Sequence, residues 1–232
     1  MITVFTWKNI GRTLEMTEKQ AILVRHSVRK YRSVRIADSL VAQLKAKIDE
    51  LNAEGNLHLQ FVEDAGKAYG NLIYKAMGLA TAPSIIVCVG EDTADLDERV
   101  GYYGEKLVLF AQTLGLNTCW TGTFNRKAVA FDVKPGERVV LAIAIGYGVD
   151  QGKDRKSKTY EQVTEVSGTA PEWFKEGVKA ALLAPTALNE QKFTIKLNAD
   201  ETVSFDTKGG GLTKIDLGIV KCHFEIGSGR QV

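Results

Sequence analysis

Apolar side chains recur every three or four residues in several segments of the chain, which is the period of an amphipathic helix. The clearest segment is 38–54, and Gly55 ends it. Its apolar positions are Leu40, Val41, Leu44, Ile48 and Leu51. We also predict helices over 17–24 and 100–114.

Two continuous apolar runs predict strands that are buried on both faces, because a half-exposed strand would alternate. They are 85–89, which follows Pro83, and 139–145. Residues 57–62 alternate between apolar and polar positions and predict a third strand. Residues 65–80 are rich in Gly and Ala and give only a weak helical pattern.

The C-terminal part of the chain predicts a helix, a hairpin and a final helix. The first helix covers 172–183 and follows Pro171. Alternating positions at 193–197 and 202–205 predict a β-hairpin, and 212–226 predict the last helix.

Two further segments lack a regular period. We predict a loop over 120–123 and a solvated, basic surface loop over 150–160. Helices and strands mix along the chain without strict βαβ alternation, and several strands adjoin hairpin signals. This order favours an α+β sandwich over a doubly wound parallel sheet.

An internal repeat is visible in this order of elements. Residues 38–63 and 172–197 each predict helix, turn and strand. Residues 83–115 and 202–227 each predict a strand followed by a helix that ends at glycine. The repeat predicts two related halves that fold face to face.

The predicted boundaries follow from these elements. Residues 1–15 are expected to be a leader or an extension, because the first helix start follows Met16. Residues 16–168 form the first half and residues 169–232 the second, shorter half. We expect both halves to form one compact unit.

Composition narrows the class of protein. The 232 residues are 44% hydrophobic and 25% charged, which is ordinary for a soluble globular chain. Lys and Arg number 30 against 28 Asp and Glu, so the formal net charge is only +2. Bulk charge therefore gives no reason to expect nucleic acid or a membrane as a partner, and no apolar run approaches the length of about 20 residues that spans a bilayer.

The cysteines indicate a reducing compartment. Cys88, Cys119 and Cys222 lie far apart and lack the CxxC spacing of a zinc site. A disulfide framework is not expected either, so we predict a cytoplasmic protein without a bound metal. Cys119 is better explained as a small buried residue than as a reactive thiol.

Three short segments carry candidate chemistry. Arg25-His26-Ser27-Val28-Arg29 places two guanidiniums and a hydroxyl just after a helix, which suits phosphate binding. A solvated basic face explains the same composition. The second segment is the basic run 153–158, which matters only if it approaches Arg25 in space.

The third segment is the turn 184–191, of sequence APTALNEQ. Pro185 ends the preceding helix, because the residue before a proline avoids the α region. The hydroxyl of Thr186 and the amides of Asn189 and Gln191 can donate to and accept from a heterocycle. A turn that caps its own backbone is the simpler alternative.

Together these segments resemble the FMN-dependent nitroreductase family. The resemblance implies that the RHSVR stretch holds the flavin phosphate and ribityl chain through Arg25, His26, Ser27 and Arg29. It implies that the PTALNEQ turn contacts the flavin through Pro185, Thr186, Asn189 and Gln191. It further implies that Lys156 and Lys158 close on the phosphate. The stretch GLNTCWTG is similar to the loop whose backbone faces flavin N5, here near Thr121 and Gly122.

The resemblance also has an unusual feature. Ordinary members carry both motifs early in the chain and complete each FMN site with a partner subunit. Here the phosphate stretch lies in the first half and the flavin-contacting turn in the second. The chain thus resembles a divergent branch in which one chain mimics the dimer, with a central, mostly antiparallel sheet flanked by helices. A monomer is expected, and a homodimer remains an alternative.

The function implied by the resemblance is an FMN-dependent oxidoreductase. Such enzymes take electrons from NADH or NADPH and reduce nitroaromatic, quinone or similar small-molecule acceptors in a ping-pong cycle. The chemistry belongs to the flavin, so no catalytic side chain is expected. The alternatives are a flavin-binding protein for storage or redox sensing, and a scaffold whose flavin site has decayed.

Three ionisable residues stay outside these motifs. Asp216 and His223 are seven residues apart on one predicted helix, so they share a face. They are expected to make polar contacts on that face, with an acid–base pair as the alternative. Glu105 follows Gly104 within a predicted helix and is a candidate for a buried, paired carboxylate.

Overall fold

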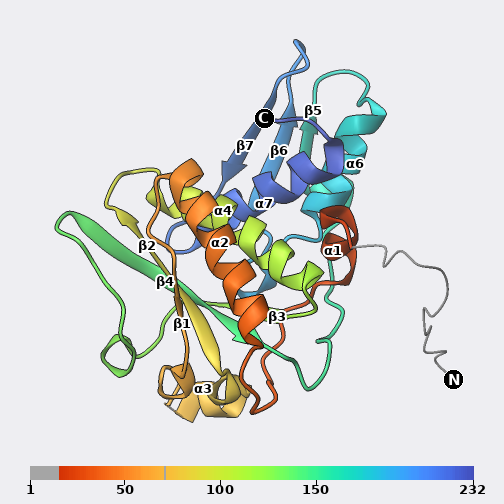
Figure 1. The fold of residues 1–232 in the computed structure, drawn as a ribbon. Coiled ribbons are helices and arrows are strands. Elements are labelled where there is room, and N and C mark those ends of the chain that lie inside the picture. The colour runs from red at the N-terminus through yellow and green to blue at the C-terminus, as the bar shows by residue number, and fades with distance from the viewer. Residues whose placement is uncertain (1–15, 71) are drawn as a thin grey trace, which may run out of the picture.

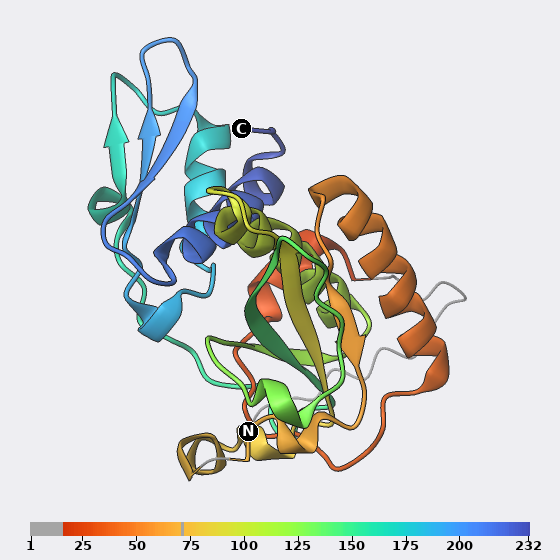
Figure 2. The same cartoon turned by 90° about the vertical axis from the view of Figure 1, so that its left-hand side faces the viewer.

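The computed structural model describes residues 16–70 and 72–232 (Figure 1). The predicted extension over 1–15 lies outside these residues. The described chain forms two β-sheets, and two packed helices lie between them (Figure 2).

The larger sheet has four strands in the order β1-β2-β4-β3, and every neighbouring pair is antiparallel. The strands are β1 (Gln60–Val62), β2 (Ser84–Glu91), β3 (Asn117–Thr121) and β4 (Glu137–Gly146). Residues of β2 and β4 contribute alternately to two separate apolar clusters, so both faces of the sheet are covered. This explains why these two runs are continuously apolar.

Helices α2 (Asp38–Gly55) and α4 (Leu96–Thr113) cover one face of this sheet. Short segments cover the other face, where Tyr69 and Leu79 are fully buried. They include η1 (Ala65–Lys67), α3 (Leu72–Met77), η2 (Leu79–Thr81) and η3 (Arg126–Ala128). The weak helical pattern over 65–80 thus corresponds to short helical turns.

The smaller sheet has three strands in the order β5-β6-β7. Its strands are β5 (Thr164–Val166), β6 (Phe193–Leu197) and β7 (Val203–Thr207). The predicted hairpin is the antiparallel pair β6–β7, and β5 joins it in parallel. The strand β5 was not predicted, because three residues are too few to show alternation. It follows α5 (Tyr160–Val163) and lies within the segment 16–168 that was assigned to the first half.

Helices α6 (Glu172–Ala181) and α7 (Thr213–Ser228) pack on the smaller sheet. The inward residues of β6 are Phe193, Ile195 and Leu197, and Phe205 of β7 meets Phe224 of α7 edge to face. Both helices were predicted, and α7 extends two residues beyond its predicted end at 226, to a C-cap at Gly229 with a left-handed φ of 71°.

Helices α4 and α7 touch backbone to backbone between the two sheets. A Cβ atom on Gly101 would lie 2.0 Å from the carbonyl oxygen of Ile215, and one on Gly218 would lie 2.0 Å from that of Glu98. Gly101 therefore faces Ile215, three residues before Gly218, and Gly218 faces Glu98, three residues before Gly101. The contact is locally two-fold, which suits the predicted repeat, although the repeat of whole halves stays a prediction.

One element prediction was wrong. Residues 120–123 were expected to be a loop, but Trp120 and Thr121 belong to β3. The sequence of β3, NTCWT, has no clear alternation, and the strand is defined by its ladder with β4. The α+β prediction itself is confirmed by two sheets built mainly from antiparallel pairs.

The segment after α1 (Glu18–Val24) runs along the free edge of β3. A capping box between Thr17 and Gln20 begins α1, and Ala21 and Ile22 pack on α4 and α7. Ser27 then forms a β-bridge with Thr118, and the N–H of Val28 donates to the carbonyl of Thr118 at 3.0 Å. This pairing places the basic stretch beside the edge strand.

Among the described residues, no helix is both long and apolar enough to cross a bilayer.

Candidate active site

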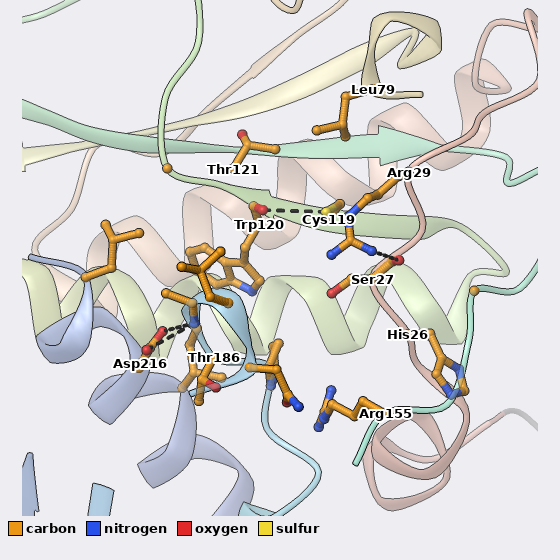
Figure 3. Close-up of a pocket in the computed structure, with 18 of the residues that line it drawn as sticks. His26, Ser27, Arg29, Leu79, Cys119, Trp120, Thr121, Arg155, Thr186 and Asp216 are labelled. Atoms are coloured by element: carbon orange, nitrogen blue, oxygen red, sulfur yellow. Dashed lines mark hydrogen bonds between the residues drawn. The ribbon is translucent and has the colours of Figure 1, made fainter. Parts of the chain in front are cut away.

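A cavity of about 750 Å³ lies where the edge of β3, the basic stretch and the turn 185–189 meet (Figure 3). Its lining comes from both parts of the chain. Ser27 and Trp120 belong to the first predicted half, and Thr186 and Asp216 belong to the second. The structure therefore brings the predicted phosphate stretch and the predicted flavin-contacting turn together in one chain.

Cationic side chains gather at one side of the cavity. The basic residues of the whole lining are His26, Arg29, Lys30, Lys153 and Arg155. Figure 3 shows Arg29, Ser27, His26 and Arg155 on the side opposite Asp216, with the Trp120 ring between them. The imidazole Nε2 of His26 lies 3.1 Å from Oδ1 of Asp154, which joins the two basic segments. The run 153–158 therefore approaches Arg25 in space, as a shared anion site would require.

Arg155 is the best-fixed cation of this group. Its Nη2 donates to the carbonyls of Leu183 and Ala184, and the latter contact measures 3.1 Å. Burial, followed by the positive charge of Arg25, lowers the pKa of Arg155 to about 10. Its Nε is buried and has no hydrogen-bond partner within the described part of the chain.

Arg25 lies behind the cavity wall, outside the lining residues. The residue is 4% exposed, its Nε lies 3.8 Å from Oε1 of Glu105, and its Nη2 donates to Oγ of Ser27 at 3.4 Å. Its Nε and Nη1 are buried and find no hydrogen-bond acceptor among residues 16–70 and 72–232. Buried donors of this kind are rare in folded proteins.

The turn contributes Pro185, Thr186, Ala187, Leu188 and Asn189 to the cavity. It includes η4 (Ala187–Asn189), and its backbone is unusual because Leu188, Asn189 and Gln191 have φ values of 52°, 57° and 48°. Left-handed φ is costly for residues with a Cβ and concentrates at functional sites. The carboxylate of Asp216 holds the turn by accepting from the N–H of Ala187 at 3.0 and 3.1 Å.

The amides of this turn brace the basic loop. Asn189 Nδ2 and Gln191 Nε2 donate to the carbonyl of Lys156 at 2.8 and 3.0 Å. Lys158 donates through its backbone N–H to Gln191 Oε1 at 2.9 Å and through Nζ to the Gln191 carbonyl at 2.7 Å. Asn189 lines the cavity, whereas Lys156, Lys158 and Gln191 do not.

The expected cation pair is therefore displaced in sequence. Lys153 and Arg155, rather than Lys156 and Lys158, reach the cavity from this loop. The irregular backbone of this loop decides which side chains face inward, and a sequence of closely spaced cations does not reveal it. The signal that could have found Arg155 is its place among four cations within the run 153–158.

The end of β3 forms the inner wall. Cys119, Trp120, Thr121 and Gly122 line it, and the Thr121 hydroxyl donates to the carbonyl of Ala142 at 2.7 Å. The Thr121 side chain is thus engaged in the sheet, and Gly122 lines the cavity beside it. The leucines and isoleucines of the lining are Leu79, Leu141, Leu188, Leu212, Ile215 and Ile219.

The sequence expectations for Cys119 and Glu105 are confirmed. Cys119 is 3% exposed, and burial raises the pKa of its thiol. Glu105 is fully buried and accepts hydrogen bonds from His223 and Trp120. Burial raises the pKa of Glu105, but the His223 hydrogen bond and the Arg25 charge outweigh it and bring the pKa below its usual value.

Asp216 and His223 do not pair with each other. Asp216 lines the cavity and binds the turn, and His223 binds Glu105. Burial, together with the negative charge of Glu190, raises the pKa of Asp216 to about 6 although the Ala187 N–H opposes the shift. Within the described residues no group of three or more His, Cys, Asp or Glu is arranged to hold a metal.

Comparison with solved structures gives the same fold. A crystal structure described as a putative nitroreductase from Thermotoga maritima MSB8 is 23% identical, with a TM-score of 0.66, and the match covers 95% of this chain and 88% of that chain. A putative nitroreductase in complex with FMN from Desulfovibrio desulfuricans is 16% identical, covers 63% of this chain and 94% of its own, and has a TM-score of 0.47.

A putative NADH oxidase from Clostridium acetobutylicum is 19% identical, covers 61% of this chain and 96% of its own, and has a TM-score of 0.47. The search of curated proteins finds no significant match. Comparison with family models matches residues 17–228 to the family described as "Putative TM nitroreductase". That match extends over nearly all the described elements, from α1 to the end of α7. The chain therefore belongs to this nitroreductase family, and the predicted nitroreductase-like α+β fold is confirmed.

Proposed function

We propose that the protein is an FMN-dependent oxidoreductase that takes electrons from NADH or NADPH and passes them to small organic acceptors such as nitroaromatics or quinones. Family membership supports an oxidoreductase function. The observation that carries the proposal is one cavity, cationic at one side and mainly apolar at the other, whose walls come from both predicted halves of the chain.

The cationic side fits a phosphate monoester. Arg155 lines the cavity and carries a buried Nε–H without an acceptor in the described structure. Arg25, whose Nη2 donates to Ser27, adds a second positive charge behind the wall. Two neighbouring guanidiniums also repel each other, which an anion between or beside them would relieve. Charge-assisted bonds to phosphate are the strong ones among protein hydrogen bonds, so the FMN phosphate is the group we assign to this side.

The remaining lining fits a flat heterocycle. Trp120 and the apolar residues of β4 and α7 offer surfaces for a ring, and the backbone near Thr121 and Gly122 offers polar groups at its edge. The cavity volume of about 750 Å³ falls within the usual range for cofactor sites. When bound, FMN supplies the hydride and electron transfer.

The residues of the chain bind, orient and shield in this proposal. Arg29, Lys153 and Arg155 attract the anionic end, and the turn 185–189 closes over the cavity from the second half. The buried side chains of Ile215 and Ile219 exclude water from the apolar part of the lining. Successive use of this one cavity by the nicotinamide donor and the acceptor accounts for a ping-pong cycle.

The proposed assembly is a monomer with one FMN per chain. In support, the phosphate stretch and the flavin-contacting turn meet without a partner subunit. A homodimer in which each chain keeps its own cavity is compatible with the same geometry.

The test is an absorption spectrum of the purified protein after incubation with FMN. We expect flavin bands near ~450 nm that remain after gel filtration and bleach on addition of NADH or NADPH under nitrogen. Retained bands that neither nucleotide bleaches would replace the enzyme by a flavin-storage or redox-sensing protein. Absence of retained FMN would contradict both.

A further inference from the structure

Four polar side chains from separate elements form a buried cluster directly behind the cavity wall. They are Arg25 after α1, Glu105 of α4, Trp120 of β3 and His223 of α7. Glu105 and His223 are fully buried, and Arg25 is 4% exposed. Only Trp120 reaches the cavity, where its ring forms part of the lining (Figure 3).

Glu105 occupies the centre of the cluster. Its Oε2 accepts the indole N–H of Trp120 at 2.8 Å, and its Oε1 lies 2.8 Å from His223 Nε2 and 3.8 Å from Arg25 Nε. The Trp120 ring rests on α4 at Gly104, where a Cβ atom would lie 2.5 Å from the ring. Gly104 thus leaves room for the Trp120 ring, and the neighbouring Glu105 holds that ring by its indole N–H.

The hydrogen-bond partners of His223 determine how many of its ring nitrogens carry a proton. Its Nδ1 lies 3.1 Å from the carbonyl of Ala180, and its Nε2 faces the Glu105 carboxylate. Both partners are acceptors, so each ring nitrogen requires a proton while Glu105 is ionised. His223 is then an imidazolium, and the cluster of Arg25, Glu105 and His223 carries one net positive charge.

We propose that Arg25, Glu105 and His223 form a buried charged unit that fixes the Trp120 indole as a wall of the cavity and holds one positive charge behind it. Glu105 is a positioning residue, and His223 supplies the charge. The unit favours an anionic ligand in the cavity, and this second part rests on the proposed FMN function.

The anchoring part is tested on the protein without flavin. In a ¹H–¹⁵N spectrum we expect the Trp120 indole N–H, assigned by its loss in Trp120→Phe, to exchange slowly with solvent because it is bound to a buried carboxylate. Glu105→Leu should shift this signal and speed its exchange. Glu105→Gln should keep the signal protected, since the amide oxygen still accepts from the indole while its NH₂ donates to a neutral His223.

A matched control lies two turns away on the same face of α4. Glu98 of α4 pairs with Lys221 of α7, just as Glu105 pairs with His223 of α7, and the Trp120 indole donates to Glu105 rather than to Glu98. Glu98→Leu should therefore leave the indole signal in place. An unchanged indole signal in Glu105→Leu would overturn the anchoring role.

The charge part makes a distinctive double-mutant prediction. His223→Gln removes the imidazolium and leaves the charges of Arg25 and Glu105 to cancel, so FMN should bind about tenfold more weakly. Glu105→Gln changes the net charge little, because neutral His223 then satisfies both partners. Combining the two substitutions leaves Arg25 alone, which restores the positive charge and should restore FMN affinity.

Riboflavin, which lacks the phosphate, is the matched neutral probe. Its affinity should change little in His223→Gln, and thermal unfolding by circular dichroism reports whether each variant is folded. A double variant that binds FMN more weakly than His223→Gln would show that the cluster acts only structurally and would overturn the charge role. Failure of the wild type to bind FMN would instead contradict the proposed function, and the indole measurement would still decide the anchoring role.

Discussion

Arg155 and Lys156 are adjacent in the sequence but have different tasks in the structure. The Arg155 guanidinium lines the cavity and is held by backbone carbonyls, whereas Lys156 contributes its own carbonyl as an acceptor for Asn189 and Gln191. Lys156 therefore helps to shape the site through its backbone, although it does not line the cavity.

Arg155→Ala is expected to weaken FMN binding by about tenfold or more, because a charge-assisted bond to phosphate contributes about 1.5–3 kcal/mol. Lys156→Ala is the matched control and should change the affinity less than threefold. Titration of flavin fluorescence measures both. A larger loss of FMN affinity in Lys156→Ala than in Arg155→Ala would contradict this assignment. It would favour Lys156 and Lys158 as the phosphate ligands, as the sequence resemblance implied.

Asp216 gives a pH prediction at the same scale. Its raised pKa, about 6 in the folded protein, means that ionising it is costlier in the folded than in the unfolded chain. Its contribution to stability is therefore present below the unfolded pKa near 4 and lost as the pH rises through about 6.

Asp216→Asn cannot ionise but can still accept from Ala187. Its free energy of unfolding relative to wild type should therefore increase between pH 4 and pH 7, by about 2 kcal/mol. Urea unfolding at several pH values measures this difference. Asp49→Asn, at an exposed position of α2, is the control and should show no such trend.

At the scale of elements, the turn 185–191 and the loop 153–158 behave as one unit. Two amide side chains and one lysine of these segments hold them together. The strained backbone of Leu188 and Asn189 is kept in place by these bonds and by Asp216.

Asn189→Leu should therefore act on the loop as well as on the ligand. We expect weaker FMN binding together with faster backbone hydrogen exchange over 153–158, because the bond to the Lys156 carbonyl is lost. Asn198→Leu, in the β6–β7 turn away from the cavity, is the control. Unchanged exchange over 153–158 would show that the loop holds its position without Asn189.

The contact between α4 and α7 is the second prediction about elements. Alanine favours a helix over glycine by about 1 kcal/mol, yet Gly101→Ala would force a methyl group into the α7 backbone. We expect it to lower the free energy of unfolding by about 3 kcal/mol. Gly66→Ala, where a Cβ meets nothing within 4 Å, should change stability little. Equal free energies of unfolding for Gly101→Ala and the wild type would show that α4 and α7 can move apart without cost.

At the scale of the whole molecule, one chain brings both predicted motifs to one cavity. Sedimentation of the wild type should show a monomer of about 25.4 kDa. Arg155→Ala and Asn189→Leu chains, each impaired in FMN binding, should not rescue each other on mixing. Recovery of binding in the mixture would instead show that two chains share each site.

The sequence by itself determined the main elements and the segments that carry the site. Period and continuity of apolar residues were sufficient for α2, β2, β4, α6 and α7, because each buries a long apolar face that local pattern records. The stretch RHSVR and the turn PTALNEQ were likewise visible, since their residue types and spacing are local properties. The family match confirms the resemblance to nitroreductases that these motifs indicated, and the roles of their residues stay predictions.

Only the tertiary structure decided which side chains of those segments reach the cavity. Arg25 turns inward to Glu105, Gln191 and Lys158 brace each other, and Arg155 takes the place expected for its neighbours. The strand β3 and the cluster of Glu105, Trp120 and His223 also depend on residues far apart in the chain. The physical reason is that burial, strand pairing and hydrogen-bond partnership are set by packing between distant segments, and no local pattern encodes them.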